Sequence, residues 1–86
     1  MDYREAWIPI DCRLPDKEGD YIVSIESDGY KEILIGTWMH DISLATLRYE
    51  DKSKAGFVIW EWCKNGSPWK EVKNAKAWME APEAYG

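Results

Sequence analysis

The stretch YIVSIESDGYKEILIGTWM, residues 21–39, decides the fold. Residues 21–27 and 30–39 are rich in β-branched and aromatic side chains, a composition that predicts two strands. Between them lies Asp28-Gly29, a dipeptide typical of a tight turn between antiparallel strands. The stretch therefore predicts a β-hairpin, and the rest of the chain is interpreted outward from it.

This hairpin can pair in two registers. A two-residue turn would pair Ser27 with Tyr30 and place Ile25 opposite Glu32. A three-residue loop would instead pair Glu26 with Tyr30. The second register gathers on one face Tyr21, Val23, Ile25, Lys31, Ile33 and Ile35. We prefer the second register, because a slip by one residue would scatter this largely apolar face.

Outside the hairpin we expect four further strands, at residues 7–10, 57–63, 69–72 and 75–79. We also expect a second turn at Asn65-Gly66. The first of these strands belongs at a sheet edge, because Pro9 has no N–H to donate to a central ladder. Pro15 and Gly19 indicate a loop over residues 13–20.

The two ends of the chain are expected to lie side by side. Trp7 stands near the start and Trp78 lies in the last strand, and we expect both indoles in one aromatic cluster. Simple alternation in the last strand places Lys76 and Trp78 on one face and Ala75, Ala77 and Met79 on the other. Because both ends then belong to the fold, we expect residues 1–86 to form a single domain.

Residues 40–56 fit two structures. Ile42, Ala45, Thr46 and Tyr49 follow one another at helical spacing. They come after Asp41, a residue type that caps helices. Strand-like alternation is shown by Ala45, Leu47 and Tyr49. We prefer a strand over residues 44–50, with one short helix in 41–50 as the alternative. The expected fold class is mainly β, a small antiparallel sheet or partly open barrel of four to six strands, or α+β if that helix forms.

The charge of the chain limits its partners. The formal net charge is −5, and residues 1–32 carry nine acidic and four basic side chains. An acidic surface repels phosphate backbones, so we expect no direct contact with nucleic acid. No apolar run approaches the roughly 18 residues of a membrane span, so we expect no membrane contact. The polar start of the chain lacks a signal sequence, so we expect a cytoplasmic protein with reduced Cys12 and Cys63.

Catalysis and metal binding find little support in the sequence. His40 is the single histidine, and its neighbour Asp41 would point to the opposite face of a strand. Cys12 and Cys63 are too far apart in the sequence for the paired ligands of a zinc site. The loop before the hairpin alternates acidic residues but lacks the other ligands of a calcium loop. We therefore expect no enzyme, no metal and no cofactor.

Short phrases at both ends of the chain point to a family. The opening holds Trp7-Ile8-Pro9-Ile10, Arg13-Leu14-Pro15 and Gly19-Asp20-Tyr21-Ile22-Val23, and the close holds Trp78-Met79 and Pro82-Glu83. These phrases resemble the domain of unknown function 551 family, small proteins often found in phages and prophages. At the close, Ala77 stands where the family has His, and residues 40–72 lie outside the resemblance. The resemblance implies a genomic setting and no activity.

The chain is rich in aromatic side chains, with six Trp, five Tyr and one Phe, which is more than a core of this size easily buries. Because exposed Trp residues anchor many protein interfaces, we expect a non-enzymatic protein-interaction module. The resemblance implies a phage or prophage accessory protein, one form of which would inhibit a host protein. The candidate partner-binding residues are Trp60, Trp62, Trp69, Asp16, Glu18 and Asp20. The alternatives are a small-ligand-binding domain with an aromatic pocket and, for assembly, a homodimer through an uncovered edge strand.

Overall fold

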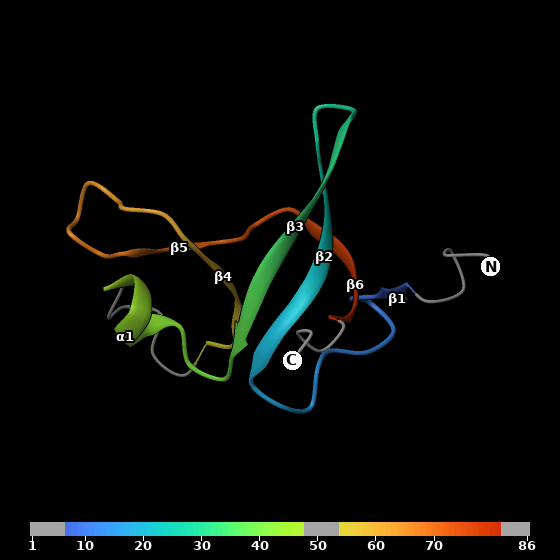
Figure 1. Cartoon of the computed structure of the whole chain (residues 1–86), viewed down its shortest axis with the longest axis horizontal. Helices are drawn as coiled ribbons and strands as arrows, with labels where there is room; N and C mark the ends of the chain where they lie inside the picture. Colours follow the sequence, from blue (N-terminus) through green and yellow to red (C-terminus); the bar gives the residue numbers. More distant parts are fainter. Residues whose placement is uncertain (1–6, 48–53, 82–86) are drawn as a thin grey trace, which may run out of the picture.

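In the part of the chain that the structure describes, six antiparallel strands form one open sheet (Figure 1). The structure is a computed structural model, and it describes residues 7–47 and 54–81. Its elements are β1 (Ile8–Pro9), β2 (Gly19–Ser27), β3 (Tyr30–Met39), α1 (Ser43–Thr46), β4 (Gly56–Trp60), β5 (Trp69–Glu71) and β6 (Ala75–Glu80). The strand order is β1-β6-β2-β3-β4-β5. The predicted fold class, a mainly β antiparallel sheet, is confirmed.

The central hairpin forms as predicted, but the preferred register is wrong. Ser27 pairs with Tyr30 and Ile25 with Glu32, across a two-residue turn. Both turn residues have positive φ, 53° at Asp28 and 78° at Gly29. A two-residue turn of this kind has a backbone twist that matches the twist of the two strands it joins. This favourable turn geometry decides the register, against the preference for placing the apolar side chains on one face. β2 also begins at Gly19, so the loop expected over residues 13–20 ends two residues earlier, before that glycine.

The N-terminal segment lies beside the last strand, as predicted. β1 is an edge strand, and its Ile8 pairs with Trp78 of β6. The ladder between β2 and β6 shifts register after Ser24, so that Ile25 faces Ala75. This bulge breaks the simple alternation expected for the last strand, because it turns both Ala75 and Trp78 toward the same side of the sheet.

One face of the sheet carries the hydrophobic core and is called the core face below. Its buried residues are Val23, Trp38, Phe57 and Trp78. The rings of Trp38 and Phe57 meet edge to face at 4.9 Å between centroids, and those of Tyr21 and Trp78 at 5.1 Å. The aromatic neighbour of Trp78 is therefore Tyr21, and the cluster expected between Trp7 and Trp78 does not form. The opposite side is called the outer face, and it carries Ile22, Ile33 and Ile35.

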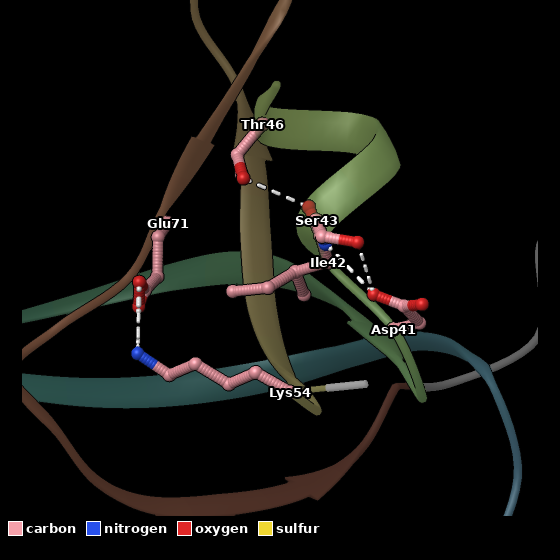
Figure 2. A network of polar contacts seen from close by, with 6 residues as sticks. All are labelled: Asp41, Ile42, Ser43, Thr46, Lys54 and Glu71. Atoms are coloured by element: carbon pink, nitrogen blue, oxygen red, sulfur yellow. Dashed lines mark hydrogen bonds and ion pairs between the residues drawn. The ribbon is translucent and has the colours of Figure 1, made fainter. Parts of the chain in front are cut away.

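Residues 43–46 form a helix, so the preference for a strand over 44–50 is wrong where the structure describes it, and the rest of that range lies outside the described residues. The helix is anchored at Ile42, whose side chain is fully buried and whose N–H donates to the carbonyl of Lys54 at 2.8 Å. The Asp41 carboxylate accepts the backbone N–H of Ser43 at 2.9 Å, which agrees with a capping role (Figure 2).

A salt bridge ties the chain that follows α1 to the edge of the sheet. Lys54 lies 3.0 Å from the carboxylate of Glu71 in β5 (Figure 2). The Thr46 hydroxyl donates to the carbonyl of Ile42 at 2.8 Å within the helix. Because Ile42 and Val58 are both fully buried, α1 covers a small second apolar cluster on the outer face of β4.

Candidate interaction surface

The three predicted tryptophans, Trp60, Trp62 and Trp69, lie together and are called the tryptophan cluster below. The Trp60 ring meets that of Trp69 edge to face at 5.2 Å between centroids, and that of Trp62 at 6.2 Å. Trp60 and Trp62 are 65% and 69% exposed. Large aromatic side chains that pack on one another and still face water are the kind that anchor protein interfaces.

The cluster is built where β4 and β5 stop pairing. Trp60 and Trp69 are directly opposite each other in the ladder, so their side chains share a face. β4 ends at Trp60, three residues before the expected end at Cys63. Pro68 explains this, because its carbonyl accepts the N–H of Glu61 but its nitrogen has no hydrogen to return. Trp62 therefore lies in the loop that leads to the predicted turn, where the N–H of Gly66 donates to the carbonyl of Cys63 at 3.0 Å.

Two side-chain hydrogen bonds hold this loop against α1, and sequence reasoning missed both residues that make them. The Ser67 side chain is fully buried, and its hydroxyl donates to the carbonyl of Ala45 and accepts the N–H of Trp69. The amide of Asn65 donates to the carbonyl of Thr46 at 2.8 Å. Asn65-Gly66 and Ser67 predicted a turn, but no sequence signal indicated that the turn would fold back onto a helix.

Exposed isoleucines extend the apolar surface beyond the tryptophan cluster. Ile33 and Ile35 of β3 are 65% and 58% exposed on the outer face. Thr37 shares their face and pairs with Val58, which in turn shares a face with Trp60. The isoleucines and Trp60 therefore face the same side of the sheet. Sequence analysis missed this extension because the preferred register placed both isoleucines on the core face.

The three predicted acidic residues have different surroundings, and among the described residues their hydrogen bonds are not to the tryptophan cluster. Asp16 lines a shallow pocket whose other residues include Tyr21 and Trp78 of the core face. A Glu18 carboxylate oxygen accepts the backbone N–H of His40 at 2.9 Å, beyond the end of β3. Asp20 lies on the outer face, where it accepts the Thr37 hydroxyl at 2.7 Å. Glu18 and Asp20 therefore join the start of β2 to the end of β3, and the three residues do not form one acidic surface.

A cavity of about 400 Å³ opens between the two arms of the sheet. Ile25 and Leu34 line it from the β2–β3 hairpin, and Ile59, Trp69 and Val72 from the β4–β5 side. Lys70 and Lys73 also line it. Glu71 lines it as well, but its carboxylate pairs with Lys54. Lys70 in turn lies 3.7 Å from the carboxylate of Glu61. Most of the wall is therefore apolar, and Lys73 adds a positive charge.

His40, Cys12 and Cys63 are the histidine and the cysteines of the described residues. His40 is exposed, and it donates its backbone N–H to the carboxylate of Glu18. The thiol of Cys63 lies 3.3 Å from the carbonyl of Trp69, and Cys12 is exposed. Over residues 7–47 and 54–81, no three His, Cys, Asp or Glu side chains lie close enough to hold a metal ion. Nor does any helix in these ranges have the length and apolar character needed to cross a membrane.

Comparison with models of protein families, with curated proteins and with solved structures finds no match for this chain.

Proposed function

We propose that this protein is a non-enzymatic interaction module that binds another protein through the tryptophan cluster. The observation that carries the proposal is the joint exposure of Trp60 and Trp62. Two indoles that meet edge to face and stay exposed to water leave apolar area unburied, which costs roughly 25 cal/mol for each Å² left uncovered. A partner surface that covers them recovers this free energy, and their ring contacts already restrict the side chains before binding.

The outer face supports the same proposal. Ile33 and Ile35 are further exposed apolar side chains on the same face as Trp60. Exposed apolar side chains gathered on one face favour an interaction site there. The separated carboxylates give the acidic residues a smaller role than the sequence indicated. We keep the tryptophans as the contact and assign Glu18 and Asp20 to the fold.

The setting that we propose is a phage or prophage, with a host protein as the partner. This rests on the resemblance of the Trp7 and Trp78 phrases to the domain of unknown function 551 family. The partner would carry a concave apolar patch, and inhibition of that partner is one consequence of covering it. We also propose that the protein acts in the cytoplasm.

Affinity capture from a lysate of the natural host, followed by mass spectrometry, tests the proposal. Wild type is expected to retain one protein in stoichiometric amount, and the double variant Trp60→Ala/Trp62→Ala is expected to lose it. The matched control is Leu14→Ala, which removes an exposed apolar side chain from the loop before β2. Circular dichroism must show that both variants keep the wild-type fold. Equal capture by wild type and the double variant would exclude the tryptophan cluster as the contact.

The cavity favours a second candidate, the binding of a small amphipathic anion. Its apolar wall would hold the body of the ligand, and Lys70 or Lys73 its charge. A thermal-shift panel of small aromatic and aliphatic carboxylates tests this candidate. A rise in the melting temperature that depends on ligand concentration and is lost in Leu34→Ala would support it, and a flat panel would exclude it.

A further inference from the structure

Most of β3 has a partner strand on only one side. β2 pairs with β3 over its whole length down to the turn, from Gly19–Trp38 to Ser27–Tyr30. On the other side, β4 pairs only with residues 37–39. Beyond Thr37 the two strands diverge, and the β2–β3 hairpin and the β4–β5 hairpin continue as separate arms (Figure 1). The space between these arms is called the notch below, and the cavity lies within it.

The backbone groups that face the notch follow from strand parity. In an antiparallel hairpin with a two-residue turn, the residues flanking the turn exchange hydrogen bonds, and every second pair does the same. Tyr30, Glu32 and Leu34 therefore bond to β2. Lys31, Ile33 and Ile35 direct their N–H and C=O groups away from β2.

Two hydrogen bonds outside this ladder confirm the parity. The N–H of Glu26 donates to the carbonyl of Asn74 at 3.1 Å, so this residue of β2 faces away from β3. The N–H of Ile10 donates to the carbonyl of Lys76 at 3.1 Å, so this residue of β6 faces away from β2. Both agree with the alternation inferred for β3. Among the described residues, nothing bonds to the outward backbone groups of Lys31, Ile33 and Ile35.

The far side of the notch offers the same kind of group. In β4, the carbonyl of Phe57 accepts the N–H of Val72, and the N–H of Glu61 donates to the carbonyl of Pro68. Both residues therefore point toward β5, and Trp60 points its backbone toward β3. The notch is thus bordered on both sides by backbone groups that a further strand could bond.

Side chains on both faces of the notch suit an extended chain. On the outer face lie Ile33, Ile35 and the ring of Trp60, all strongly exposed. The cavity is lined by Leu34 and Ile59 from the core face and by two lysines. Thr46 of α1 and Trp69, which belong to the outer face, also line it. Native proteins usually protect an open edge with inward charges, a proline or a bulge. Tyr30–Gly36 contains no proline, its pairing with β2 shows no register shift, and its centre is Ile33-Leu34-Ile35.

We propose that the notch binds one extended segment of the partner protein, which adds to β3 as a new strand. The segment alternates apolar side chains, one set entering the cavity and the other covering Ile33 and Trp60, and it carries an acidic residue that meets Lys70 or Lys73. The proposal rests on the proposed function and names the form of its partner. A second copy of this chain fits less well, because its β3 brings β2 along its other edge, and the notch is closed on the far side by β4.

Amide hydrogen exchange, followed by NMR, tests the proposal residue by residue. In the free protein, the amides of Ile33 and Ile35 should exchange much faster than those of Glu32 and Leu34. The probe is the synthetic peptide acetyl-Val-Thr-Val-Thr-Val-Thr-Glu-amide, whose three valines and glutamate share one face of a strand. At saturation it should slow the exchange of Ile33 and Ile35 by at least about tenfold, since an amide bonded in a strand exchanges only when the strand opens.

Two matched controls change the peptide and not the protein, so no variant of the protein has to fold. One carries N-methyl groups on its three valines and the other on its three threonines. Because alternate residues of an added strand donate to β3, at least one of these peptides should bind about tenfold or more weakly than the probe. Equal binding by all three would overturn strand addition, as would binding without protection at Ile33 and Ile35.

The outcomes also separate this inference from the proposed function. Should the probe leave the β3 amides unprotected while Trp60→Ala/Trp62→Ala still loses the captured host protein, the interaction module stands and strand addition fails. Should the free protein show protection at Ile33 that grows with its own concentration, the edge is filled by a second copy, and the partner segment is excluded. Protection by the probe together with equal capture by the double variant would keep the edge site and reject the tryptophan contact.

Discussion

The molecule holds two aromatic groups of similar ring geometry and opposite exposure. On the core face, Trp38 meets Phe57 at 4.9 Å and is 4% exposed. In the tryptophan cluster, Trp60 meets Trp69 at 5.2 Å and is 65% exposed. Because both groups pack edge to face, ring geometry alone does not show which group contributes to the stability of the fold. Burial does, and the comparison predicts that stability depends on the first group and binding on the second.

The largest effect is expected from removing a core indole. Trp78→Ala should lower the free energy of unfolding by about 3–5 kcal/mol, because it loses buried area and leaves a cavity against Tyr21 and Val23. A domain of this size has a total stability on the order of 5–10 kcal/mol, so the variant should lose a large share of its stability. Urea denaturation followed by circular dichroism checks this. A loss below about 1 kcal/mol would contradict the assignment of Trp78 to the core.

A smaller loss is expected from the residue that supports the exposed group. Ser67→Ala should cost about 1–3 kcal/mol, because it leaves the carbonyl of Ala45 and the N–H of Trp69 without their buried partner. The same denaturation measurement applies, with the exposed Ser27→Ala as the control, expected to change stability by less than about 0.5 kcal/mol. If both serine variants behaved alike, the contact between the loop and α1 would contribute nothing to stability.

Much of the sheet could be predicted from the sequence because its signals are local. Asp28-Gly29 and Asn65-Gly66 marked both tight turns, and β-branched and aromatic composition marked the strands beside them. The register was harder, since it set two physical terms against each other. Gathering Ile33 and Ile35 onto the core face favoured a three-residue loop, whereas the positive φ values available to Asp28 and Gly29 favoured a two-residue turn. The turn geometry prevails, and the isoleucines are left exposed.

The candidate surface could be predicted where its residues are close in the sequence and not where they are distant. Trp60, Trp62 and Trp69 surround one turn, so their proximity follows from the hairpin. Glu18 and Asp20 hydrogen-bond to residues beyond and within β3, and no local pattern reveals such contacts. The bulge in β6 was also hidden, because an alanine fits either face of a sheet and Ala75 gave no sign of its side.

A finer contrast lies within the core itself. Trp38 and Trp78 are equally buried, but only Trp78 has a partner for its indole N–H, the carbonyl of Arg13 at 2.8 Å. The indole nitrogen of Trp38 is buried without a hydrogen-bond partner among the described residues. Trp78→Phe should therefore cost about 1–2 kcal/mol more than Trp38→Phe, from the lost hydrogen bond and the weakened contact with the Arg13 guanidinium. Parallel melts of the two variants check this, and equal losses would mean that the bond to Arg13 adds nothing.

The smallest effect is expected at the most exposed indole, and it decides whether the two groups differ as proposed. Trp62→Ser should change the free energy of unfolding by less than about 0.5 kcal/mol, because a side chain that is 69% exposed loses little burial when it is removed. Urea denaturation measures this change, and Trp38→Ser serves as the destabilising reference. A loss above about 1.5 kcal/mol would show that Trp62 supports the fold, and its exposure would then no longer argue for a partner. Unchanged stability combined with lost capture of the host protein would leave binding as the role of this tryptophan, since the fold would have no use for it.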